Sequence, residues 1–82
     1  MLSLKTIKKY EPEMREKKVS EVARSRRGYL TALKRAGNYD NLSDAWKSKQ
    51  KAFVARHYSQ YKKKPTRRRR LALIAWSFDP ER

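Results

Sequence analysis

The sequence contains no cysteine, only two glycines and a single histidine. Without cysteine, disulfide frameworks, zinc fingers and thiol chemistry are excluded. The glycines, Gly28 and Gly37, are too few for a glycine-rich phosphate-binding loop, and His57 alone leaves a metal site poorly supplied with ligands. No paired carboxylates lie in an apolar segment and no nucleophile stands beside a base, so we expect no enzymatic activity and no cofactor.

Long hydrophobic segments are also missing. The longest apolar run, from Leu71 to Trp76, is far shorter than the roughly 20 residues of a membrane-spanning helix. No apolar segment follows Lys5, Lys8 and Lys9, as it would in a secretory signal. We therefore expect an intracellular protein, in the cytoplasm, nucleoid or nucleus, or one carried in a virion or ribonucleoprotein particle.

Acidic residues are scarce. Eight Asp and Glu face 23 Lys and Arg, which gives a net charge of +15 in 82 residues. Fewer than one residue in five is Leu, Ile, Val or Phe, although five Tyr and two Trp add apolar area. The length and composition predict one small basic domain over residues 1–82 with a thin core, in which the cations repel one another unless an anion is bound.

The remaining pattern is helical. Pro12 suits the first position of a helix, so we expect a lead-in over residues 1–12 and a first helix over about 13–36. Gly37 is a good stop for this helix. Gly28 interrupts its apolar stripe and leaves open a kink or a break between Ser25 and Gly28.

Two further helices complete a predicted all-α bundle of three main helices. Ser43 is a good cap for a helix over about 44–62, and Thr66 for one over about 67–78. The apolar faces of the three helices predict the core residues Leu30, Leu33, Trp46, Phe53, Leu71, Ile74 and Phe78. The opposite face of the second helix carries only small residues, which indicates packing against another helix or, alternatively, a slot for a phosphate backbone: Ala45, Ser48, Ala52, Ala55 and Ser59.

The strongest functional signal is a basic run over residues 62–70 around Pro65 and Thr66. Its seven cations are Lys62, Lys63, Lys64, Arg67, Arg68, Arg69 and Arg70. If Thr66 caps a helix, four arginines occupy a first turn whose dipole favours anions. A phosphate bound there would relieve the unfavourable charge, so we predict a phosphate site; a solvated basic loop or a localisation signal is the alternative.

Secondary candidates lie on the first two predicted helices. They are Arg24, Arg27, Lys34, Arg35, Lys47, Lys51 and Tyr58, the last as a ring that could stack or bind a phosphate. Arg26 falls inside the apolar stripe, where we expect its stem to pack on the core, a cation at a groove edge being the alternative. We expect His57 at the edge of the core rather than as a ligand or base.

These patterns predict a protein that binds DNA or RNA through phosphates with little sequence specificity. A helix-turn-helix is disfavoured, because the helix expected over 67–78 is apolar and has no Asn or Gln to read base edges. Two alternatives remain: a structural protein of a virion or ribonucleoprotein particle that meets an acidic protein partner, and a binder of anionic membrane surfaces.

Overall fold

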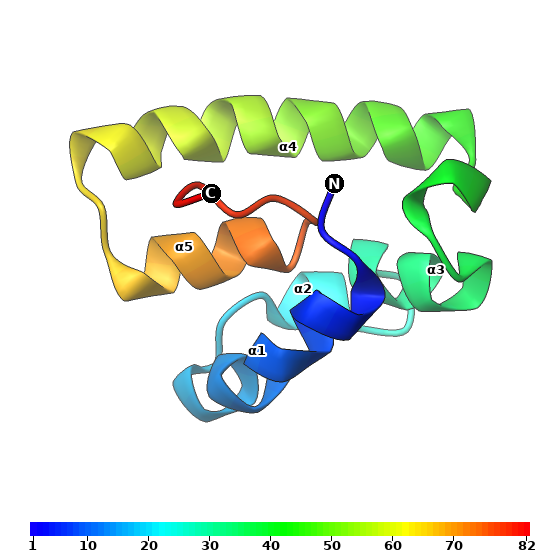
Figure 1. Cartoon of the computed structure of the whole chain (residues 1–82), viewed down its shortest axis with the longest axis horizontal. Coiled ribbons are helices and arrows are strands. Elements are labelled where there is room, and N and C mark those ends of the chain that lie inside the picture. The colour runs from blue at the N-terminus through cyan, green and yellow to red at the C-terminus, as the bar shows by residue number, and fades with distance from the viewer.

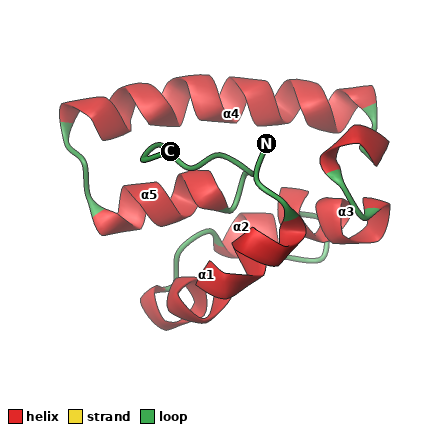
Figure 2. Ribbon diagram, in the orientation of Figure 1, coloured by secondary structure: helices red, strands yellow, loops and turns green.

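The computed structural model describes all 82 residues and contains helices but no strands. The predicted all-helical class is confirmed, but four helices of at least eight residues replace the predicted three. These are α1 (Leu4–Lys17), α3 (Tyr29–Ala36), α4 (Asp44–Lys63) and α5 (Arg67–Ile74). A single-turn helix α2 (Glu21–Arg24) and a 3₁₀ turn η1 (Tyr39–Asn41) complete the fold (Figures 1 and 2).

The longest helix, α4, runs along one edge of the molecule (Figure 1). The chain turns back after it, so that α5 packs beside α4, and α1 packs on α5 in turn. The short helices α2 and α3 contact each other. The two chain ends meet, because the N–H of Leu2 donates a 3.0 Å hydrogen bond to the carbonyl of Ser77.

Helix α1 replaces the predicted lead-in over residues 1–12, so that prediction is wrong. The helix begins after Ser3, whose hydroxyl accepts the N–H of Thr6 at 3.3 Å. Pro12 lies inside the helix rather than at its first position. An interior proline costs about 3 kcal/mol, but Ile7 and Met14 are completely buried on the same helix, and their burial offsets that cost.

The helix predicted over 13–36 is divided at two places. The first break follows α1, where Lys18 has a left-handed backbone (φ 55°) and the N–H of Val19 donates to the carbonyl of Met14 at 2.8 Å. The second lies between Ser25 and Gly28, where the sequence allowed either a kink or a break. A Cβ atom on Gly28 would lie 2.1 Å from the carbonyl oxygen of Val22, so this tight approach needs glycine.

The predicted signals at the other helix ends are confirmed. Gly37, with φ 89°, ends α3. Ser43 accepts the N–H of Trp46 at 3.3 Å at the start of α4, and Thr66 accepts the N–H of Arg69 at 3.1 Å at the start of α5. Helix α5 ends at Ile74 instead of residue 78, because the chain turns through Ser77 (φ 66°).

All the buried apolar side chains except Leu73 form one cluster, to which α1, α3 and α5 contribute most. It includes four of the predicted core residues, which are Leu30, Leu33, Leu71 and Ile74. The other three are only half-buried, namely Trp46, Phe53 and Phe78. Helix α4 lies at the edge and buries Gln50 alone, so its aromatic side chains cover the core rather than fill it.

Two surface features differ from the expected packing. The small-residue face of α4, from Ala45 to Ser59, is exposed, so the expectation that it packs against another helix is wrong, whereas the alternative of a slot for a phosphate backbone stays a prediction. On one continuous helix over residues 13–36 the spacing would place Val22 on the apolar stripe with Leu30 and Leu33, but α2 and α3 are separate helices and Val22 is 80% exposed.

Candidate nucleic-acid interface

Two arginines of the basic run are neutralised within the chain. Arg67 binds both carboxylate oxygens of Glu13, at 2.8 and 2.6 Å, and Arg70 binds both oxygens of Asp79, at 3.1 and 3.0 Å. The hydrogen bond from Arg67 lowers the pKa of Glu13 to about 2, and Arg70 lowers the pKa of Asp79. Internal carboxylates, rather than an external anion, therefore balance these two charges at the start of α5.

The other two arginines are oriented but not neutralised. Arg68 donates to the carbonyl oxygens of Lys17 and Lys18, at 2.6 and 3.2 Å, and Arg69 donates to that of Lys64 at 2.8 Å. Neither has an acidic partner within 4 Å, since no ion pair involves them. A guanidinium carries five N–H donors, so each keeps both its charge and free donors.

A hollow of about 300 Å³ opens beside these two side chains. Arg68 and Arg69 line it together with His57, Gln60 and Ser20, and no carboxylate takes part. Partial burial, and then the neighbouring cation Arg56, lower the pKa of His57, so the ring is neutral at pH 7. The hydroxyl of Ser20 is buried without a hydrogen-bond partner. The hollow thus offers two cations and unpaired polar groups to an anion.

Three lysines extend this positive region at the end of α4. Lys62, Lys63 and Lys64 are exposed and form no ion pair. We call these lysines together with Arg68 and Arg69 the basic corner. Five of the seven predicted cations of the run therefore remain without an acidic partner. They lie at the end of α4, in the connection over residues 64–66 and at the start of α5.

Tyr58 is less available than its sequence position suggested. Its ring packs edge-on against Phe78, with the ring centres 5.1 Å apart, and the Lys62 ammonium lies 4.9 Å from its centre. The side chain is half-buried. These contacts give Tyr58 a packing role at the flank of α4.

The secondary cations are spread over the molecule. Lys34 forms an ion pair with Glu11 at 2.7 Å, and Arg24 donates twice to the carbonyl of Val19, at 3.2 and 3.1 Å. Lys47 donates to the carbonyl of Asp40 at 3.1 Å, whereas Lys51 is exposed without such a contact. These residues do not join the basic corner.

Arg27 and Arg35 belong to a second positive hollow, of about 360 Å³. Arg26 lines it with them, beside the ring of Trp46. Arg26 is exposed and lines this hollow, which places its charge at the edge of a groove. The break at Gly28 moves this arginine off the apolar stripe, because the two segments no longer share one helix axis.

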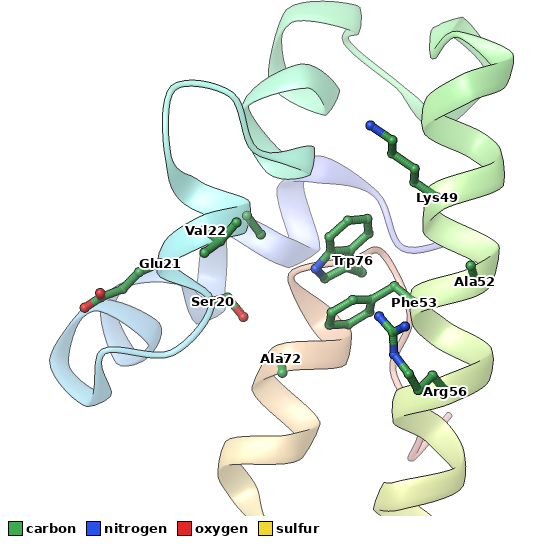
Figure 3. A pocket seen from close by; sticks show the side chains of 10 residues that line it. Ser20, Glu21, Val22, Lys49, Ala52, Phe53, Arg56, Ala72 and Trp76 are labelled. Atoms are coloured by element: carbon green, nitrogen blue, oxygen red, sulfur yellow. The ribbon is translucent and has the colours of Figure 1, made fainter.

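A larger groove of about 630 Å³ lies between α2 and α4 (Figure 3). We call it the central groove. Phe53 and Trp76 form its floor, and Lys49 and Arg56 extend from α4 beside it (Figure 3). Sequence reasoning did not select these two cations as site residues. The signal was present, since residues 49, 52, 53 and 56 repeat at the spacing of one helix face.

Comparisons with known proteins do not identify the chain: no family model, curated protein or solved structure matches it. The structure has no helix that is both long enough and apolar enough to cross a membrane. It also has no group of three His, Asp or Glu side chains arranged to hold a metal ion.

Proposed function

We propose that the protein binds DNA or RNA through backbone phosphates at the basic corner, with little sequence specificity. One observation carries this proposal: backbone carbonyls hold Arg68 and Arg69 in place, yet no carboxylate neutralises either of them. An arginine that is already oriented loses less side-chain entropy when it binds. Its planar fork matches two phosphate oxygens, so such a pair favours phosphate as the ligand.

The overall charge favours a polyanion over a small anion. Five of the 23 Lys and Arg side chains form ion pairs, which leaves 18 without an acidic partner. A continuous phosphate backbone can meet several of these cations at once and release its counterions. The positive electrostatic potential of the protein also attracts such a ligand toward its surface.

Weak sequence preference follows from the burial of α5. Leu71, Leu73 and Ile74 are fully buried, so the body of this helix cannot lie in a DNA groove. Its charged side chains at the hollow, Arg68 and Arg69, come from the first turn, and the small Ala72 is the only other residue of α5 that lines it. Contacts to phosphate position a protein on nucleic acid but carry no base identity.

The test is fluorescence anisotropy with labelled DNA and RNA, single-stranded and duplex, each in two unrelated sequences. The variant is Arg68→Gln/Arg69→Gln. The control is Lys5→Gln/Lys8→Gln, which removes the same charge from exposed positions at the far end of α1. Lys5 lies about 18 Å along that helix from Lys17, whose carbonyl Arg68 contacts.

The arginine variant should lose several-fold more affinity than the control, and by a similar factor on both sequences. Equal losses of affinity in the two variants would mean that only net charge matters and that the basic corner is not the binding site. A loss confined to one sequence would mean that these arginines read bases. Circular dichroism and thermal melting of each variant exclude unfolding as the cause.

A further inference from the structure

The central groove is apolar, although it lies on a strongly basic molecule. Its lining includes the exposed side chain of Val22 on α2 and two small residues, Ala52 on α4 and Ala72 on α5. Phe53 and Trp76 lie at its centre (Figure 3). Val22 is 80% exposed and, with Met1, is one of two large apolar side chains that the fold leaves in solvent. Exposed apolar grooves of this kind mark interaction sites.

The aromatic rings of the groove have little free face for a nucleic-acid base. Trp76 is stacked against Phe53, with the ring centres 4.3 Å apart and the planes at 11°. Its other stacking partner is Tyr29, at 4.6 Å and 15°, so the indole lies between two rings. His57 packs against Phe53 at 3.8 Å. The groove therefore presents ring edges and methyl groups, which suit aliphatic side chains better than stacked bases.

The charges around the groove define the chemistry of its occupant. Lys49 and Arg56 line it from α4 and form no ion pair, and Glu21 is its single acidic lining residue, on the α2 side. The neighbouring hollows add further arginines, namely Arg26, Arg27, Arg35, Arg68 and Arg69. A second copy of this chain, with a charge of +15, is repelled by this rim, whereas a segment rich in carboxylates is attracted.

We propose that the central groove docks an acidic amphipathic helix of a partner protein. Aliphatic side chains on one face of that helix would contact Val22, Phe53 and the edge of Trp76. Its carboxylates would meet Lys49 and Arg56. This is the helix-in-groove mode of recognition, which uses anchors at i, i+3 or i+4, and i+7. The central groove adjoins the hollow beside the basic corner, with which it shares Ser20 and Ala72, but the proposed contacts to Val22, Phe53 and Trp76 do not depend on nucleic-acid binding.

The probe is a labelled synthetic peptide about four helical turns long, with leucines at the anchor spacing and glutamates elsewhere. A scrambled peptide of the same composition, without an apolar face, reports purely electrostatic attraction. The groove variant is Ala52→Phe, which fills the groove from an exposed helical position. The matched control is Ala55→Phe, one turn further along the same helix, also exposed and outside the groove lining. Val22→Ser is a second groove variant.

We expect the amphipathic peptide to bind at least about tenfold more tightly than the scrambled one, a difference that specific contacts at the centre of an interface can supply. Ala52→Phe and Val22→Ser should remove most of this advantage, whereas Ala55→Phe should keep it. Equal binding of the two peptides would overturn the proposal. It would also be overturned if Ala52→Phe left peptide binding unchanged but weakened binding of a single-stranded thymidine oligonucleotide, because the groove would then take bases.

Discussion

Arg70 binds Asp79 through two parallel hydrogen bonds, from Nε to Oδ1 at 3.1 Å and from Nη2 to Oδ2 at 3.0 Å. The two side chains are 17% and 3% exposed. Asp79 Oδ1 also accepts the N–H of Glu81 at 3.0 Å, so the pair fixes the chain after α5 against the first turn of that helix. This ion pair stabilises the fold and removes Arg70 from the set of cations that are available to a ligand.

Replacing Asp79 by Asn should destabilise the protein, because the largely buried Arg70 would lose its bidentate partner and keep only the longer ion pair with Glu81, at 3.5 Å. We expect a loss of about 2 kcal/mol, below the value for a completely buried pair because Arg70 retains some exposure. Urea denaturation at pH 7 measures it. A matched change at the exposed Asp40, Asp40→Asn, should alter the free energy of unfolding by less than about 0.5 kcal/mol.

The same pair predicts the behaviour of the protein in acid. The folded-state pKa of Asp79 is lowered by Arg70, so its stabilisation is complete above the unfolded pKa of about 3.9 and is lost as the pH falls through the folded value. Glu13, with its pKa lowered to about 2, acts in the same direction. The free energy of unfolding should fall steeply below about pH 4, and Asp79→Asn should flatten that fall. This account would be contradicted if the free energy of unfolding of Asp79→Asn fell as steeply below about pH 4 as that of the native protein.

Gly28 should tolerate no side chain. A Cβ there would lie 2.1 and 2.2 Å from the carbonyl oxygens of Val22 and Ala23, so the backbone would have to move. We expect Gly28→Ala to cost roughly 1–3 kcal/mol, which would lower the melting temperature by several degrees. Arg27→Ala, at the exposed neighbouring position, should melt close to the native protein. Equal melting temperatures for Gly28→Ala and Arg27→Ala would show that the carbonyl oxygens of α2 do not approach Gly28 this closely.

The core and the aromatic cover of α4 should differ in their contributions to stability. Leu30 is fully buried, and Leu30→Ala should cost about 3 kcal/mol or more. Phe53 is half-buried against Trp76, so Phe53→Ala should cost less, about 2 kcal/mol. Denaturation in the presence of a stabilising osmolyte keeps both variants folded enough to compare. If Phe53→Ala lost more stability than Leu30→Ala, the centre of the core would lie on α4.

Polyanions should stabilise the native protein against heat. Most of its cations have no acidic partner, and any ligand that binds only the folded state raises stability by mass action. The melting temperature should increase with heparin or sulfate at fixed ionic strength. The rise should be smaller for Arg68→Gln/Arg69→Gln than for Lys5→Gln/Lys8→Gln. Melting curves that do not respond to heparin would show that no folded-state anion site exists.

Helix ends that depend on local chemistry were predictable from the sequence. Ser43 and Thr66 bond to an N–H three residues away, and Gly37 supplies a positive φ, so each signal acts within one turn. The beginning of α1 was not predicted, because the preference of proline for the first position of a helix is also a local signal and pointed to Pro12. Burial of Ile7 against distant segments decides that helix, and no local pattern reports it.

The candidate site was predictable as composition but not as geometry. The basic run is plain in the sequence, yet Arg67 meets Glu13 from 54 positions away, and Arg68 meets the carbonyl of Lys17 from 51. Which arginines are neutralised and which stay charged is therefore set by how α1 packs on α5. The central groove likewise combines residues of α2, α4 and α5, so only its α4 contribution had a sequence signal.

The dependence of duplex-DNA affinity on salt tests the central proposal most directly. If the five cations of the basic corner each neutralise one phosphate, a plot of log K against log salt should have a slope of about −4.5. Arg68→Gln/Arg69→Gln should bring the slope to about −2.7, because two contacts are lost, whereas Lys5→Gln/Lys8→Gln should leave it near −4.5. A native slope retained by the folded arginine variant would contradict the account, because the two oriented arginines would then contact no phosphate.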